Sequence, residues 1–202
     1  MSASSAPSFA TSSRRASRTP WVVLGLLAYE PMTGYDLKAA IQATVGHFWQ
    51  ESYGQLYPTL HALRDDGLVT MTHEADGGRT RNVYAITDEG RAAVLAWLAE
   101  DPRPTPVRNE LLLKVFFASH AGPDALRPHL ETARARAREQ RHVLGAIRDG
   151  IANEPASDHE RFCWSLTVDL GLRNADAAEA WALAALDALG ERDAPRSAEA
   201  RA

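Results

Sequence analysis

Residues 52–86 read SYGQLYPTLHALRDDGLVTMTHEADGGRTRNVYAI, and this stretch decides the fold. Its first part predicts a helix that Ser52 opens, because Gln55 follows three residues later as in a capping box. Leu56, Leu60 and Leu63 recur at helical spacing and predict the buried face of this helix. Gly67 is expected to end it.

A β-hairpin is predicted from the second part of the stretch. Residues 68–73 and 82–86 have the alternation and the β-branched side chains of strands, and residues 76–78 supply an Asp-Gly-Gly turn between them. Thr87 is then expected to cap a further helix. The predicted apolar positions of that helix are Val94, Leu95 and Leu98.

Two helices are predicted before this stretch. Thr19 is expected to cap the first, with Pro20 at its first position, and Pro31 is expected to end it. Thr33 is expected to cap the second, which runs from Gly34 to Thr44. Three helices, a hairpin and a fourth helix make the layout of a winged helix-turn-helix, whose third helix normally enters the major groove of DNA.

The C-terminal half of the sequence reads as helical throughout. Leu111 to Ala118 predicts an apolar helix, and apolar positions then recur at steps of four and three from Leu126 to Ile151, as in a heptad seam. A last pair of helices is expected at about Asp158 to Leu170 and Ala175 to Leu189, closed by Gly190. The long seam needs a partner face, which could lie within the chain or in a second copy, and we favour an isologous homodimer.

The predicted fold class is mainly α with a small β-hairpin: a winged helix-turn-helix followed by an antiparallel helical dimerisation domain. The expected divisions are a disordered tail at 1–18, a winged-helix DNA-binding domain at 19–101, a proline linker, a helical dimerisation domain at 107–190 and a frayed tail at 191–202. An alternative reading of the arginine-bearing N-terminal tail is a basic arm that touches DNA.

Composition places further bounds on the protein. The 202 residues, of which 45% are hydrophobic, suffice for one or two domains. No apolar run approaches the ~20 residues of a membrane span, and the start lacks the long apolar segment of a secretory signal. Cys163 is the single cysteine, which excludes a disulfide framework and suits a reducing compartment. We therefore expect a cytoplasmic protein.

Enzyme signatures are absent from the sequence. There is no Gly-x-Gly-x-x-Gly motif after a strand and no Walker-type loop. None of the seven histidines stands four residues from another, and none joins a second cysteine. We therefore expect no catalytic residues, no metal site and no cofactor.

Several motifs in these elements resemble the PadR family of bacterial regulators. They are Met32-Thr33-Gly34-Tyr35-Asp36-Leu37, Gly54-Gln55-Leu56-Tyr57-Pro58-Thr59-Leu60, Tyr84-Ala85-Ile86-Thr87-Asp88-Glu89-Gly90 and, further on, Leu113-Lys114-Val115-Phe116-Phe117 with the Trp181 helix. The resemblance covers about residues 19 to 190. It implies a dimeric winged-helix repressor that binds inverted-repeat operators. Some members of the family are released from DNA by a small, often aromatic, ligand.

The candidate DNA contacts are polar or basic residues of the second helix, the third helix and the wing. They are Tyr35, Lys38, Ser52, Tyr53, Gly54, Gln55, Tyr57, Thr59, His61, Arg64, Arg79 and Arg81. Gln55 suits bidentate pairing with adenine, whereas the two wing arginines suit the sugar-phosphate backbone. The two tyrosines have packing as an alternative role, and Lys38 has that of a solvated surface charge.

One property of the expected DNA-binding domain opposes this assignment. Residues 19–101 contain five basic and eleven acidic side chains, a net charge of −6. A basic domain is the usual mark of DNA binding. The alternative hypothesis is therefore a winged-helix module that binds protein and has no affinity for DNA.

Aromatic residues suggest a site for a flat effector. The candidates are Trp97, Phe116, Phe117, Trp164 and Trp181. Such residues stack on aromatic ligands, and ordinary hydrophobic packing is the alternative explanation for them. Cys163 is expected to be a buried and inert thiol rather than a redox switch.

Overall fold

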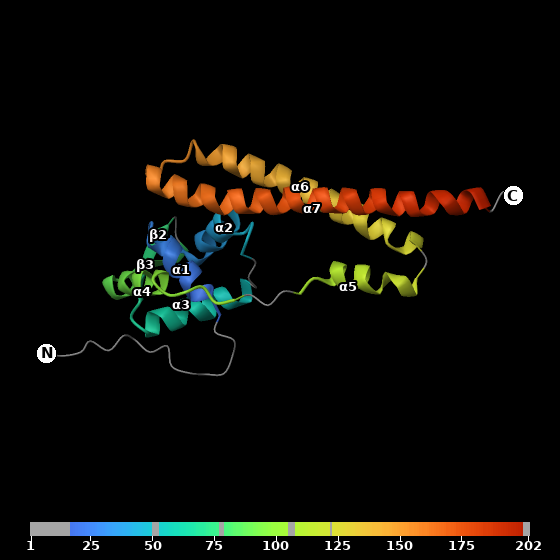
Figure 1. Cartoon of the computed structure of the whole chain (residues 1–202). Helices are drawn as coiled ribbons and strands as arrows, with labels where there is room; N and C mark the ends of the chain where they lie inside the picture. Colours follow the sequence, from blue (N-terminus) through green and yellow to red (C-terminus); the bar gives the residue numbers. More distant parts are fainter. Residues whose placement is uncertain (1–16, 50–52, 77–78, 105–107, 122, 200–202) are drawn as a thin grey trace. The chain divides into compact units, whose positions relative to one another are not determined.

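The computed structural model describes residues 17–49, 53–76, 79–104, 108–121 and 123–199. The chain divides into two compact units, Met1–Arg103 and Pro104–Ala202 (Figure 1). The tail expected at residues 1–18 lies outside the described residues, except for Ser17 and Arg18. No helix in the described ranges is both long enough and apolar enough to cross a membrane.

The first unit packs four helices around one apolar core. They are α1 (Thr19–Leu27), α2 (Gly34–Thr44), α3 (Leu56–Asp65) and α4 (Asp88–Leu98). Leu24 of α1, Leu37 of α2 and Leu60 of α3 are completely buried in this core. The predicted stripe of α3 is confirmed, since Leu56 and Leu63 are buried as well.

A small antiparallel sheet completes the first unit. β2 (Val69–Asp76) and β3 (Arg79–Ile86) form the predicted hairpin, and both strands reach the turn. A two-residue strand, β1 (Met32–Thr33), adds to the other side of β3, so the strand order is β1-β3-β2. The sequence analysis did not predict β1, because two residues are too few to display strand alternation.

The helix caps differ in part from the predicted ones. Thr33 and Asp36 form a reciprocal capping box at α2, and the Thr87 hydroxyl accepts the Gly90 N–H at α4, so both predicted caps are present. Thr19 does not cap α1: its N-cap is Arg18, and the Thr19 hydroxyl is bonded to that of Ser17 at 2.6 Å.

The predicted opening of α3 by Ser52 is also wrong. A 3-10 turn, η1 (Tyr53–Gln55), precedes α3, and Gln55 is the N-cap itself, without a side-chain capping bond. The start at Leu56 leaves Pro58 in the first turn, where the missing N–H is least costly. Ser52 lies outside the described residues.

In α4 the prediction of core positions was partly wrong. Leu95 and Leu98 are exposed, and the buried residues are Gly90 and Ala93. Small residues on this face let α4 approach the core closely. A β-carbon at Gly90 would stand 2.2 Å from the Leu68 carbonyl oxygen, so no side chain fits there.

The second unit is a helical hairpin preceded by shorter elements. They are α5 (Glu110–Phe117), η2 (Ala118–His120), η3 (Pro123–Ala125), α6 (Arg127–Ile151) and α7 (Asp158–Glu199). Figure 1 shows α6 and α7 running alongside each other. The predicted break between Leu170 and Ala175 is wrong, because α7 is continuous, and it passes Gly190 into the tail expected to be frayed.

The predicted heptad seam is the interface between α6 and α7. Leu130, Ala137, Leu144 and Ile151 are the buried residues of α6 and lie seven residues apart, as in a coiled coil. The opposing side chains of α7 are small or β-branched: the buried ones are Val168, Ala175 and Ala182. The seam therefore finds a partner face inside the chain.

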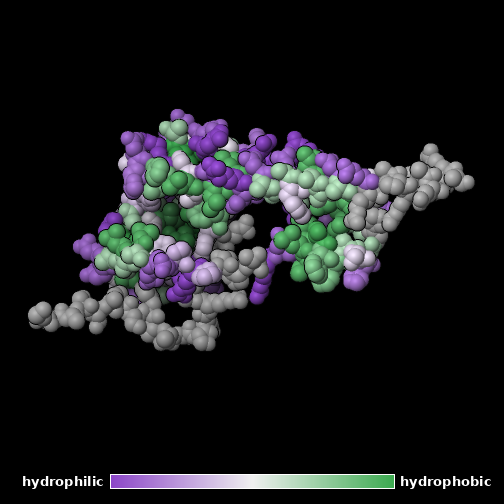
Figure 2. Space-filling model, viewed as in Figure 1, coloured by the Kyte–Doolittle hydropathy of each residue, from purple (hydrophilic) through white to green (hydrophobic). Residues whose placement is uncertain are grey.

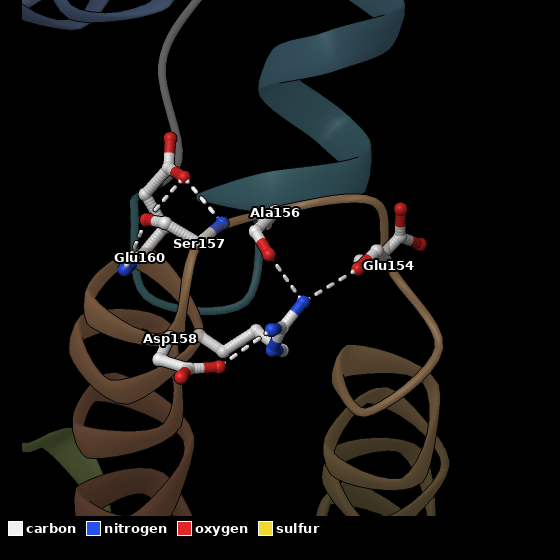
Figure 3. A network of polar contacts seen from close by, with 6 residues as sticks. Glu154, Ala156, Ser157, Asp158 and Glu160 are labelled. Atoms are coloured by element: carbon white, nitrogen blue, oxygen red, sulfur yellow. Dashed lines mark hydrogen bonds and ion pairs between the residues drawn. The ribbon is translucent and has the colours of Figure 1, made fainter.

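A polar network fixes the connection between α6 and α7 (Figure 3). The Arg161 guanidinium donates to the carbonyls of Glu154 and Ala156 and pairs with Asp158 at 2.7 Å. The Ser157 hydroxyl and backbone N–H both donate to the Glu160 carboxylate, at 2.6 and 2.7 Å. These two bonds, the hydroxyl one above all, lower the pKa of Glu160 below its ordinary value.

Candidate nucleic-acid interface

The exposed face of α3 is built by the same periodicity that buries its leucines. Tyr57, His61 and Arg64 follow one another at steps of four and three, and all three are exposed. At 100° per residue this row is centred about 100° round the helix from the leucine stripe, on its flank. Helix α3 therefore offers one aromatic, one imidazole and one cationic side chain in a line.

Two tyrosines present their hydroxyl groups on the first unit. Tyr57 is 54% exposed and Tyr35, the second residue of α2, is 77% exposed. Neither hydroxyl has a hydrogen-bond partner among the residues that the structure describes. A tyrosine hydroxyl in this state is an available donor for a phosphate oxygen.

The remaining predicted residues of the α3 region are only partly brought together. Gly54 and Gln55 are exposed in the turn before the helix. Thr59 is half-buried beside the leucine stripe, so it lies at the edge of the exposed face. Tyr53 belongs to η1, and Ser52 is outside the described ranges.

The wing places its arginines opposite carboxylates. In the β2–β3 register, Arg81 pairs with Glu74 and Arg79 with Asp76. Arg81 is exposed, as is Glu74 on the neighbouring strand. Cross-strand neighbours of opposite charge attract each other, so Arg81 is not a bare cation.

The other two basic candidates lie on the helices. Arg64 forms a hydrogen-bonded pair with its neighbour Asp65, at 2.9 and 3.2 Å, while Lys38 is exposed on α2. Exposed pairs of this kind contribute little to stability and exchange easily for another anion. His73 bonds through Nδ1 to the Asn82 side chain across the hairpin at 2.9 Å.

Gly34 is a residue that the sequence analysis did not select. Gly34 is buried against the ring of Tyr57. In the sequence it stands out only as a member of the motif at residues 32–37. No signal of periodicity or charge marks such a glycine. Its tertiary neighbour, 23 positions along the chain, becomes visible only in the fold.

The five aromatic effector candidates are distributed over both units. Trp97 stacks on Trp21 with ring centroids 5.3 Å apart. Phe116 and Phe117 are exposed on α5, with their rings edge to face. Trp164 packs against the α6–α7 core, and Trp181 is exposed further along α7.

These positions do not form a pocket within one unit. Trp164 and Trp181 are separated by seventeen residues of continuous helix, which is about 25 Å at 1.5 Å per residue. A groove of about 940 Å³ between α6 and α7 is lined by none of the five aromatic residues. Arg127, Arg134 and Arg138 line it together with Asp187 and Glu191.

The single cysteine is not buried as predicted. Cys163 is exposed on α7, and its sulfur lies 3.8 Å from Nε2 of His159, one turn earlier. In the described portion of the chain, no group of three or more potential ligand side chains is placed to hold a metal ion.

Two family models match the chain, one for each half. Residues 23–96 match the Transcriptional regulator PadR-like family, and residues 107–190 match the Virulence activator alpha C-term.

Curated relatives are similar to the chain over different lengths. The negative transcriptional regulator PadR of Bacillus subtilis is 33% identical over 49% of this chain and 56% of its own length. The chain thus matches little more than half of that relative. A probable transcriptional regulator of Mycobacterium tuberculosis is 28% identical over 86% of this chain and 98% of that protein.

Solved structures share the fold. Bacillus subtilis PadR in complex with operator DNA has a TM-score of 0.76 at 23% identity, over 86% of this chain and 99% of that one. The same protein in complex with p-coumaric acid has a TM-score of 0.73 at 23% identity, over 88% and 99%. The winged-helix prediction is confirmed by this likeness.

Proposed function

Since residues 23–96 match the PadR-like family of transcriptional regulators, we propose that the chain is a repressor that binds an inverted-repeat operator as a homodimer. The observation that carries the proposal is the exposed face of α3. Tyr57, His61 and Arg64 line that face, on the flank of the helix next to the buried leucines. Helix α3 would enter the major groove, and the β2–β3 hairpin would follow the adjacent backbone.

Base reading is assigned to the start of α3 and backbone contact to the tyrosines and the wing. Gln55 is exposed at the N-cap, the end of a recognition helix that meets base edges. Tyr35, Tyr57 and Arg81 would bond to phosphates. The protein would act in the cytoplasm, where its DNA target is accessible.

The proposals of repression and of a symmetric operator are based on the relatives. The Bacillus subtilis protein is named a negative regulator, and one of its structures is titled a complex with operator DNA. A two-fold symmetric dimer would present two copies of α3 to two half-sites, which is why an inverted repeat is the expected operator.

Homodimerisation is supported by apolar faces that stay exposed among the described residues of the second unit. Figure 2 shows hydrophobic surface around α5. Phe162, Leu166 and Leu170 make a second row on α7, four residues apart, away from the buried Val168. The exposed apolar side chains of α5 are Leu112, Leu113, Phe116 and Phe117. Exposed apolar area of this extent marks an interface.

An aromatic effector would modulate this binding. The ligand in one structure of the Bacillus subtilis relative is p-coumaric acid, an aromatic carboxylic acid. Trp97, Phe116, Phe117, Trp164 and Trp181 remain the proposed contacts. The exposed rings among them would need a second copy of the chain to complete a pocket.

DNase I footprinting on the promoter of the protein's own gene tests the proposal. We expect protection of two half-sites about 10 base pairs, or a multiple of that, apart. Arg81→Ala should weaken the footprint, and Arg103→Ala, a change outside the winged helix, is the matched control. No protection at low salt would favour the alternative of a protein-binding module. The net charge of −6 over residues 19–101 is consistent with that alternative.

A further inference from the structure

We propose that Gly34 is a positioning residue for DNA recognition, which sets the place of the Tyr57 ring through the absence of its own side chain. The inference rests on the proposed DNA binding and assigns a role to a residue that makes no polar contact itself. It joins the first residue of α2 to the second residue of α3.

The Tyr57 ring lies in the space that a side chain at position 34 would occupy. A β-carbon built on Gly34 would stand 2.7 Å from Cε1 of Tyr57 and 3.1 Å from both Cζ and the hydroxyl oxygen. A β-carbon essentially never lies within 3.0 Å of another group's heavy atom, so an alanine at position 34 requires the ring to move. All three atoms belong to the hydroxyl end of the ring, which is the end that would meet DNA.

The backbone conformation at position 34 does not require a glycine. Gly34 has no positive φ, unlike Gly67 at 74°. It stands in the first turn of α2, where an alanine is acceptable to the backbone and has the higher helix propensity. Space for the Tyr57 ring is the remaining reason for a glycine at this position.

A side chain at position 34 would displace the exposed hydroxyl end of the Tyr57 ring rather than residues of the core. Tyr57 is 54% exposed, and its ring can swing outward without moving the buried leucines. An alanine at position 34 should therefore leave the fold intact and shift the hydroxyl. One misplaced hydrogen bond to a charged phosphate corresponds to about a tenfold loss of affinity.

The test is a double-mutant cycle with Gly34→Ala, Tyr57→Phe and the combination of the two. Gly25→Ala, a helical glycine of α1 with no atom within 4 Å of a built β-carbon, is the matched control. The dissociation constant for the operator duplex and the melting temperature are measured for each. Ring-carbon NMR signals of the tyrosines, assigned through Tyr57→Phe, report the ring position without DNA.

The inference predicts opposite effects on affinity and stability. Gly34→Ala should weaken operator binding about tenfold, with an unchanged or higher melting temperature and a shifted Tyr57 signal. The double variant should bind no more weakly than Tyr57→Phe, and Gly25→Ala should bind like the wild type.

Three results would overturn it. If the wild type binds the operator and Gly34→Ala binds it as tightly as Gly25→Ala, the role of Gly34 is refuted and the proposed function stands. Losses that add in the double variant would show that Gly34 acts by another route. A wild type that binds no operator would refute the proposed function, and the role of Gly34 in it.

Discussion

Each arginine of the candidate DNA interface has an acidic neighbour. The Arg64 guanidinium is bonded to Asp65 at 2.9 Å, and Arg81 stands opposite Glu74 in the hairpin register. A phosphate must compete with these carboxylates. For the proposed DNA binding, this competition and the net charge of −6 over residues 19–101 together predict modest, salt-sensitive affinity.

Gln55 and Arg81 should differ in what their loss changes. Gln55→Ala should relax base preference at one position of each half-site, by about 1–3 kcal/mol of discrimination. Arg81→Ala should weaken binding evenly across sequences and reduce the slope of log affinity against log salt by about 1. Titrations on the operator and on single-base variants measure both. Uniform losses from both substitutions would contradict base reading by Gln55.

His47 should make the stability of the first unit depend on pH. Burial lowers its pKa, against a smaller raising effect of its backbone hydrogen bond with Thr44. The unfolded chain then binds the proton more readily, so the stabilisation is complete above about pH 6.5, the ordinary imidazole value, and is lost as the pH falls below it.

Thermal unfolding between pH 7.5 and pH 5 measures this dependence. His47→Gln should flatten the fall in melting temperature, while the control His61→Gln on the exposed face of α3 should follow the wild type. Parallel profiles for the wild type and His47→Gln would show that His47 does not cause the effect.

Among the elements, those specified by local sequence were the predictable ones. The bounds of α2 and the Thr33 cap follow from residues adjacent in the chain, and the seam of α6 follows from its seven-residue spacing. The continuity of α7 was not predictable, because Gly171 and Gly190 resemble helix ends. A β-carbon at Gly171 would stand 2.8 Å from Leu144, so packing against α6 explains that glycine.

The candidate site was predictable to a similar extent. Exposure of Tyr57, His61 and Arg64 follows from the leucine periodicity, whereas the contact between Gly34 and Tyr57 depends on how α2 meets α3. The edge position of Thr59 and the exposure of Leu95 likewise depend on tertiary packing, which one sequence does not display.

The connection between α6 and α7 should depend on Arg161. Arg161→Ala removes donors from the carbonyls of Glu154 and Ala156 and should lower the free energy of unfolding by about 1–3 kcal/mol. Arg173→Ala is the matched control, because Arg173 pairs with Asp169 at 2.7 Å on the exposed surface of the same helix. Its effect should stay within about 0.5 kcal/mol. Equal effects in urea unfolding would contradict a special role for Arg161.

At the scale of the whole molecule, the second unit has two apolar surfaces with different uses. The seam of α6 and α7 is satisfied within the chain, so it no longer argues for a dimer by itself. The exposed row of Phe162, Leu166 and Leu170 on α7 does argue for a dimer. The proposed homodimer therefore depends on a face that the heptad pattern did not identify.

Leu166→Glu should convert the dimer into monomers. A buried charge without a partner opposes association strongly, and operator affinity should fall with it because the two half-sites are no longer bound together. Light scattering after size exclusion measures the mass, with Gln140→Glu as a control of equal charge at an exposed polar position of α6. A dimeric mass for Leu166→Glu would place the interface elsewhere.

The central claim is sequence-specific DNA binding, and fluorescence anisotropy tests it most directly. Labelled DNA from the gene's own promoter and a scrambled duplex of equal length are titrated with the full chain at two salt concentrations. We predict tighter binding to the promoter, weakened by salt in proportion to the phosphates contacted. Equal affinity for both duplexes, or no binding at the lower salt, would contradict the account.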